Sequence, residues 1–164
     1  METEIVQDGV LAQDQTQIQE LWSCREGITE CLGHWGGVYK YDLSIPIANM
    51  YDIVNDVRDR LTEAGLLGDD ESYPVVDVVG YGHMGDANIH LNIPVRKLDK
   101  TVEKQLEPYI YEWVQKKDGS ISAEHGLGLA KKAYIGYSRN ETMVDLMRQI
   151  KSLYDPVSLA FSKL

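Results

Sequence analysis

Cysteine is scarce in this sequence, whose 164 residues contain only Cys24 and Cys31. Both fall on one predicted helix, and their spacing gives a rise of about 10 Å along the helix axis, which is too far for a disulfide. We therefore expect two reduced thiols, as in proteins of reducing compartments. Long apolar runs are also missing. None approaches the roughly 18 residues that span a bilayer, so we expect no membrane-embedded segment.

Basic residues are few as well. The chain has 16 lysines and arginines against 26 aspartates and glutamates, which gives a net charge of -10 and a pI of about 4.8. This balance opposes binding to nucleic acids or to anionic membranes. The N-terminal stretch Met1–Gly9 is short and acidic, so no signal or transit peptide is predicted. The chain ends in Ser162-Lys163-Leu164, which matches the peroxisomal import tripeptide.

The most informative stretch runs from Val75 to Ile93. It begins with a β-branched apolar run, passes through a tip rich in Gly, Asp and Asn, and ends in alternating residues. This pattern predicts two strands joined by a turn. The antiparallel hairpin would bring His83 and His90 to the same end, and Asn92 would share the face of His90. Glycines at 80, 82 and 85 leave room for close approach to the backbone.

The remaining elements follow from helical periodicity and strand alternation. We predict helices from Asp14 or Thr16 to about Leu32, over 47–64, over 99–117 with an interruption at Pro108, and over 140–154, together with a strand from Val38 to Ile45. The first helix carries an apolar stripe formed by Ile18, Leu21, Trp22, Ile28 and Leu32. This order predicts a single α+β domain over 1–164, an antiparallel sheet with helices packed on one face around a ferredoxin-like split βαβ element.

Two cations stand out on these elements. Arg25 lies within the apolar stripe of the first helix, with Thr29 on the same face. Its side chain either snorkels at the edge of the stripe or points inwards, where its planar fork would suit a carboxylate. Lys40 is an isolated cation in a tyrosine-rich strand, where it is either a solvated lysine or part of a site. The sequence leaves both alternatives open.

A second histidine motif follows the third helix, where Glu124 and His125 stand in a segment that continues with two glycines. His83, His90 and Glu124 would make a three-ligand metal set with an open coordination position. Such a set suits Zn²⁺ and would also accept Mn²⁺ or Co²⁺. The spacing matches no short metal signature, and a histidine of this kind taken alone is more often a satisfied core or turn residue. A zinc hydrolase using the same three residues is a further alternative.

Four motifs, taken together, resemble those of a known family. They are Leu21–Thr29, Val38–Pro46, Gly80–Asn92 and Ser122–Gly128. The chain from about residue 10 to 156 resembles the flavin-dependent 2-hydroxy-acid dehydrogenases of the vanillyl-alcohol-oxidase-like superfamily, and in particular their FAD-linked oxidase C-terminal substrate domain. The Tyr-Lys-Tyr-Asp strand favours the D-2-hydroxyglutarate branch over the relatives that act on D-lactate or glycolate.

The resemblance implies a role for each candidate residue. His83, His90 and Glu124 would hold Zn²⁺ or another divalent metal. The substrate's carboxylates would be bound by Arg25, Thr29 and Lys40, with Asn92 lining the pocket, and His125 would be the general base. The implied reaction oxidises a D-2-hydroxy acid, most closely D-2-hydroxyglutarate to 2-oxoglutarate. The metal acidifies the α-hydroxyl, a histidine takes its proton near neutral pH, and hydride passes to FAD. Neighbouring strand residues point to opposite sides, so Glu124 and His125 can share a pocket only if the chain bends there.

The sequence also departs from the family. The family's flavin-binding domain precedes the substrate domain, and this chain is too short to contain it. The residues after Asp155-Pro156 lack the usual Asn-containing tail. In addition, Ala87 replaces a glycine. That last exchange matters only where φ is positive. We therefore expect the chain to be inactive by itself, with an exposed apolar patch that permits a homodimer. The resemblance implies a mitochondrial location and a flavoprotein electron acceptor. A catalytically inactive metal-binding or interaction fragment of the same fold is the alternative.

Overall fold

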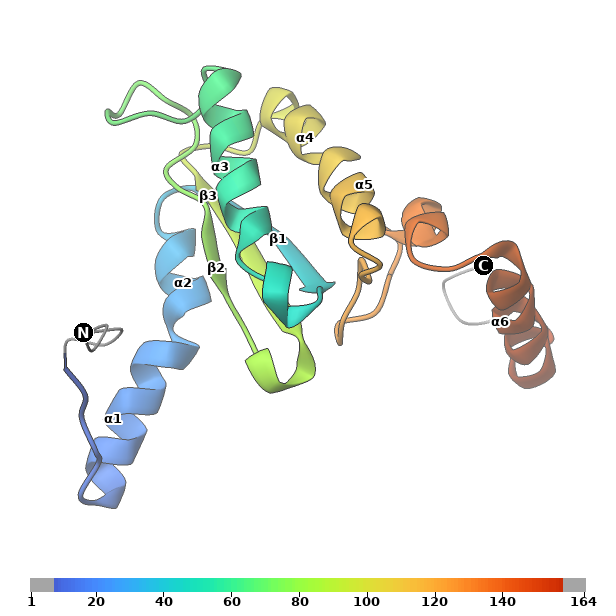
Figure 1. Cartoon of the computed structure of the whole chain (residues 1–164), viewed down its shortest axis with the longest axis horizontal. Coiled ribbons are helices and arrows are strands. Elements are labelled where there is room, and N and C mark those ends of the chain that lie inside the picture. Colours follow the sequence, from blue (N-terminus) through green and yellow to red (C-terminus); the bar gives the residue numbers. More distant parts are fainter. Residues whose placement is uncertain (1–7, 158–164) are drawn as a thin grey trace.

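The computed structural model describes residues 8–157, so the Ser162-Lys163-Leu164 tripeptide lies outside the described residues. The centre of the fold is an antiparallel sheet in the order β1-β3-β2, formed by β1 (Gly37–Ser44), β2 (Val79–Tyr81) and β3 (Asn88–Val95) (Figure 1). Strands β1 and β2 both run antiparallel to β3, which lies between them. Two parallel strands joined through a helix and separated by a third strand form a split βαβ unit, so the predicted fold class is confirmed.

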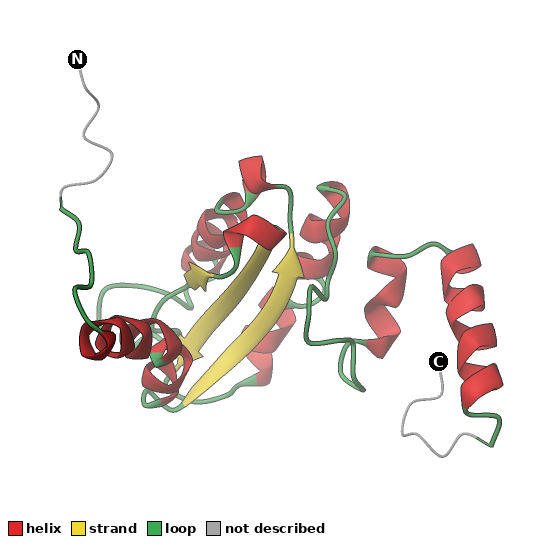
Figure 2. Ribbon diagram, turned by 90° about the horizontal axis from the view of Figure 1, so that it is seen from below, coloured by secondary structure: helices red, strands yellow, loops and turns green. Residues whose placement is uncertain are grey.

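Helices α3 (Asp52–Glu63), α4 (Lys100–Leu106) and α5 (Tyr109–Lys116) cover one face of this sheet (Figures 1 and 2). Odd-numbered residues of β1 and β3 pack against them. The buried core includes Tyr41, Leu43, Ile89, Leu91, Ile93, Val54, Val57, Leu61, Val102, Leu106, Ile110 and Val114. Because side chains alternate along a strand, the even-numbered residues of β1 and β3 point to the opposite face. That second face carries the candidate site.

The first predicted helix differs from expectation in two ways. It is divided at Gly27 into α1 (Gln15–Glu26), capped by Asp14, and α2 (Ile28–Gly33). Glycine weakens a helix interior, and a Cβ at Gly27 would lie 3.0 Å from the Ser23 carbonyl oxygen. The predicted apolar stripe is not buried either, since Trp22 is 58% exposed and α1 has no buried residue. Helix α1 extends beyond the sheet, and its part of the stripe is exposed (Figure 1). The rest of the stripe, Ile28 and Leu32, is half-buried because α2 contacts β1 and β3.

Two other boundaries were predicted only in part. The helix over 47–64 begins as a separate 3-10 turn, η1 (Ile47–Asn49), before α3. The apolar run predicts a strand that begins at Val75, but β2 begins only at Val79. Val76 still donates its N–H to the Pro94 carbonyl of β3. The pairing is interrupted after it, because the Val78 N–H donates to the Asp77 carboxylate. The interruption at Pro108 is confirmed as the boundary between α4 and α5.

The C-terminal part contains η3 (Lys132–Tyr137) and α6 (Glu141–Tyr154), which is capped by Asn140 and extends away from the sheet (Figures 1 and 2). Its apolar side chains at Met143, Leu146, Ile150 and Leu153 are exposed. Cys24 and Cys31 are free and exposed, which confirms that they form no disulfide. None of the helices within residues 8–157 has the length and apolar character needed to cross a membrane.

Candidate active site

The open face of the sheet forms the floor of a cavity of about 580 Å³. Helices α1 and α2 form one wall and the segment after α5 forms the other. All eight residues singled out in the sequence line it: Arg25, Thr29, Lys40, His83, His90, Asn92, Glu124 and His125. The structure therefore brings together residues that are separated by up to a hundred positions in the chain.

The hairpin tip places the first two histidines as predicted. His83 precedes a 3-10 turn, η2 (Met84–Asp86), and His90 follows in β3, so that the ring centroids lie 5.4 Å apart. Gly82 allows this tight return, because a Cβ there would lie 2.3 Å from the Asn88 carbonyl oxygen. Ala87 closes the tip with φ +54° and ψ +28°, in the left-handed region. The position at which the resemblance leads us to expect a glycine thus adopts a positive φ.

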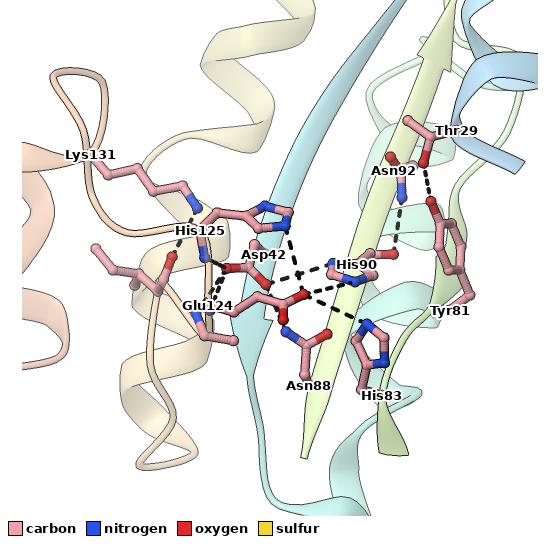
Figure 3. Close-up of polar contacts among 12 residues, drawn as sticks. Thr29, Asp42, Tyr81, His83, Asn88, His90, Asn92, Glu124, His125 and Lys131 are labelled. Carbon is pink, nitrogen blue, oxygen red and sulfur yellow. Dashed lines mark hydrogen bonds and ion pairs between the residues drawn. The ribbon is translucent and has the colours of Figure 1, made fainter. Parts of the chain in front are cut away.

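Glu124 is the point on which the imidazoles converge (Figure 3). Its Oε1 lies 3.4 Å from His90 Nε2, 3.7 Å from His83 Nε2 and 3.7 Å from His125 Nε2. The ring of His125 stacks on that of His90 with an interplanar angle of 10°. Glu124 and His125 consequently both reach the cavity although they are neighbours in sequence.

Asp42 on β1 accounts for the bend that makes this possible. Its Oδ2 accepts the backbone N–H groups of Ala123 (3.1 Å), Glu124 (2.8 Å) and His125 (2.8 Å). Its Oδ1 accepts from the Asn88 side-chain amide at 2.7 Å and lies 3.6 Å from His90 Nδ1. Three consecutive N–H groups turned towards one carboxylate hold the segment in a curved rather than an extended conformation.

Burial and charge act on the titratable groups of the cavity in opposite directions. Burial lowers the pKa of His90, although the carboxylates of Asp42 and Glu124 oppose that shift. For Asp42, burial would raise the pKa, but hydrogen bonds from the His125 and Glu124 N–H groups and from Asn88 bring it below its ordinary value. Burial also lowers the pKa of Lys131, whose ammonium donates to the Ile121 carbonyl at 3.0 Å. The neutral imidazole and the carboxylate are thereby both favoured.

The residues expected to bind carboxylates lie on the other side of the cavity. The Arg25 guanidinium stands 4.7 Å from the centre of the Tyr81 ring, and the hydroxyls of Thr29 and Tyr81 share a hydrogen bond (Figure 3). Arg25 is half-buried and borders the cavity, so the inward orientation is the one that the structure adopts. Lys40 is exposed at the edge of the cavity, whereas Asn92 is buried and donates to the His90 carbonyl at 3.1 Å.

Asp42, Tyr81 and Lys131 are among the cavity residues that sequence reasoning missed. Strand alternation puts Asp42 on the same face as Lys40, and that shared face was the available signal. Tyr81 offered none, because an aromatic residue between glycines is typical of an ordinary strand. Lys131 follows the Gly-rich motif at Glu124 but has no regular spacing to it.

The sequence of this chain is similar to a known family and to several curated proteins. The family model described as "FAD linked oxidases, C-terminal domain" matches residues 1–160. A Schizosaccharomyces pombe protein named as a mitochondrial D-lactate dehydrogenase is 59% identical over 95% of this chain and 30% of its own length. The mitochondrial D-2-hydroxyglutarate dehydrogenase of Arabidopsis thaliana is 49% identical over 95% of this chain and 26% of its own length.

A third relative is the D-2-hydroxyglutarate–pyruvate transhydrogenase of Saccharomyces cerevisiae, which is 43% identical over 94% of this chain and 31% of its own length. The chain thus spans less than a third of the length of each of these curated relatives. The similarity extends over nearly the whole chain, including the segments that form both walls of the cavity.

Proposed function

The chain belongs to the family of FAD-linked oxidase C-terminal domains, and we propose that it supplies the metal and substrate site for oxidation of a D-2-hydroxy acid, D-2-hydroxyglutarate to 2-oxoglutarate. The observation that carries this proposal is the convergence of His83, His90 and His125 on one oxygen of Glu124. It is a metal-type donor set placed in the same cavity as the cationic side chains of Arg25 and Lys40.

The donor set fits a divalent metal. Ligand atoms about 2.1 Å from one zinc ion in a tetrahedron lie about 3.4 Å from one another. The distances from Glu124 Oε1 to the Nε2 atoms of His83 and His90 are 3.7 and 3.4 Å, close to that value. We propose these three residues as the ligands, which leaves a fourth position for substrate. A divalent cation bound there would acidify the substrate hydroxyl, and FAD would accept the hydride.

The other residues of the chain would orient the substrate and move one proton. The His125 side chain is 66% exposed and its Nε2 lies 3.7 Å from Glu124 Oε1. It therefore stands beside the proposed metal position, where it would take the hydroxyl proton as general base. Arg25 and Thr29 would hold one carboxylate, and Lys40 the other. Asn92 lies on the cavity floor and would line the pocket beneath the substrate.

D-lactate is the second candidate substrate, because the 59% identical relative is named as a D-lactate dehydrogenase. A monocarboxylate needs one cationic clamp and a dicarboxylate two. The cavity has Arg25 on one wall and Lys40 at the edge of the floor. This pair favours the dicarboxylate. We propose a mitochondrial setting and a flavoprotein electron acceptor on the same grounds of relationship, the relatives being named as mitochondrial enzymes.

Calorimetric titration tests the proposal directly. Zn²⁺ or Mn²⁺ should bind the full chain, and D-2-hydroxyglutarate should then bind more tightly than D-lactate and should not bind after chelation. His83→Ala should weaken metal binding by more than the roughly 10- to 100-fold loss that follows removal of an outer-shell partner. His34→Ala is the matched control, since His34 does not border the cavity. Metal binding without binding of any hydroxy acid would favour the inactive metal-binding module instead.

A further inference from the structure

Asp42 is a buried carboxylate for which the reaction proposed above has no use. It is 3% exposed and lies in the middle of the cavity floor. It is on β1, two residues after Lys40 and directly opposite His90 of β3. Burying a carboxylate is costly unless hydrogen bonds compensate for the lost water. Here both oxygens are engaged, one by three backbone N–H groups and the other by Asn88. So fully satisfied a group is typical of a fixed structural anchor.

We infer that Asp42 is the positioning residue of this site, and that its one carboxylate orients Glu124, His125 and His90 together. The inference rests on the proposed function for its consequence in metal binding, but the structural part stands independently of it. Asp42 lies more than eighty positions before the segment 123–125, so the bend in that segment is imposed by a contact between β1 and the loop and not by local sequence.

The two oxygens of Asp42 have separate tasks. Oδ2 gathers the N–H groups of Ala123, Glu124 and His125, and so presents the Glu124 and His125 side chains on the same side. Oδ1 faces His90 Nδ1 at 3.6 Å. A carboxylate beside Nδ1 keeps the proton on that nitrogen and leaves the lone pair on Nε2, which is the atom turned towards Glu124.

Asp42 could also be regarded as a ligand, because Asp42, His90, Glu124 and His125 offer donor atoms that all lie within 4.8 Å of one another. The hydrogen bonds argue against this. The lone pairs of Oδ2 are directed at three N–H groups, and Oδ1 already accepts from Asn88. Coordination by Asp42 would break the contacts that bring Glu124 into place. His83 has no such engagement among the described residues and completes the ligand set in its stead.

Hydrogen exchange measured by NMR tests the anchor without any metal. Ala123, Glu124 and His125 are exposed loop residues, yet their amides should exchange at least about ten-fold more slowly than those of Gly126 and Leu127. The ¹⁵N spectrum should place the proton of neutral His90 on Nδ1. Exchange of the three amides at the rate of an open loop, or a proton on Nε2, would overturn the inference in the wild-type chain itself.

Asp42→Asn then tests the consequence. The isosteric amide keeps one acceptor oxygen but loses the charge, so it should reduce the protection of the three amides and weaken Mn²⁺ or Zn²⁺ binding about 10- to 100-fold, as the loss of an outer-shell partner does. Asp145→Asn, at an exposed position on α6, is the matched control and should change neither. Metal affinity as low as that of His90→Ala would make Asp42 a ligand, and unchanged protection in a folded Asp42→Asn chain would remove its anchoring role. Should the wild type bind no metal, the proposed function fails, while the exchange data still decide the role of Asp42.

Discussion

Replacement of Ala87 by glycine should stabilise the chain. Ala87 sits at φ +54°, where an L-residue with a Cβ is disfavoured by about 1–2 kcal/mol. Glycine removes that strain, but it also lowers the free energy of unfolding by about 0.5–1 kcal/mol, because it makes the unfolded chain more flexible. The backbone contacts at this tip, including Ile45 N–H to the Ala87 carbonyl at 2.9 Å, are unaffected by the change. We expect a net gain of about 0.5–1 kcal/mol in the free energy of unfolding.

Urea denaturation followed by circular dichroism measures this gain. The midpoint should rise with an unchanged slope, and the melting temperature should increase by roughly 1–4 °C for a chain of this size. Ala64→Gly is the matched control, because Ala64 has φ -76° at the end of α3. There glycine relieves no strain and should destabilise. If Ala87→Gly destabilises the chain as much as Ala64→Gly does, the reasoning from the positive φ is refuted.

Tyrosines carry the remaining predictions. Tyr81→Phe keeps the ring under Arg25 but loses the hydroxyl contact with Thr29. The Kd for D-2-hydroxyglutarate should therefore rise about 2- to 13-fold, which is the effect of losing one hydrogen bond. An unchanged Kd in calorimetry would contradict this prediction. Burial, reinforced by the Glu107 carboxylate, raises the pKa of Tyr41 and Tyr111. The folded chain therefore holds protons that unfolded tyrosines release near pH 10, and stability should fall as the pH rises above about 10. Phenolate absorbance should show a step that coincides with unfolding, and separate titration of both groups in the folded chain would count against it.

The parts of the site that could be predicted are those with local causes. Turn chemistry and strand alternation placed His83 and His90 at one end of the hairpin because both features act over a few residues. The convergence of Glu124 on them was suggested by residue chemistry and by family resemblance, not by any short spacing. The conditional role of Ala87 was likewise foreseeable, since only a positive φ makes a glycine matter there.

The parts that could not be predicted depend on contacts between distant segments. Periodicity identifies the apolar face of a helix but not whether another element covers it, which is why the exposure of Trp22 and its neighbours on α1 was missed. Asp42 looked like one polar residue among several on its strand. Its role depends on the contact between β1 and the segment from Ala123 to His125, and the spacing of these residues in the sequence does not predict that contact.

The two walls of the cavity are anchored to very different degrees, and this bears on how the site works. The floor strands share the core with α3, α4 and α5, and Asp42 ties the segment at Glu124 to that floor. The opposite wall carries Arg25 on a helix with no buried residue, and its contacts to the floor include those with Tyr81. Elements with few buried contacts open at low free-energy cost. The proposed metal ligands and Lys40 thus lie on the well-packed side of the cavity, whereas Arg25 lies on the wall that has few buried contacts. A substrate bridging the two would order the second wall while the first is already in place.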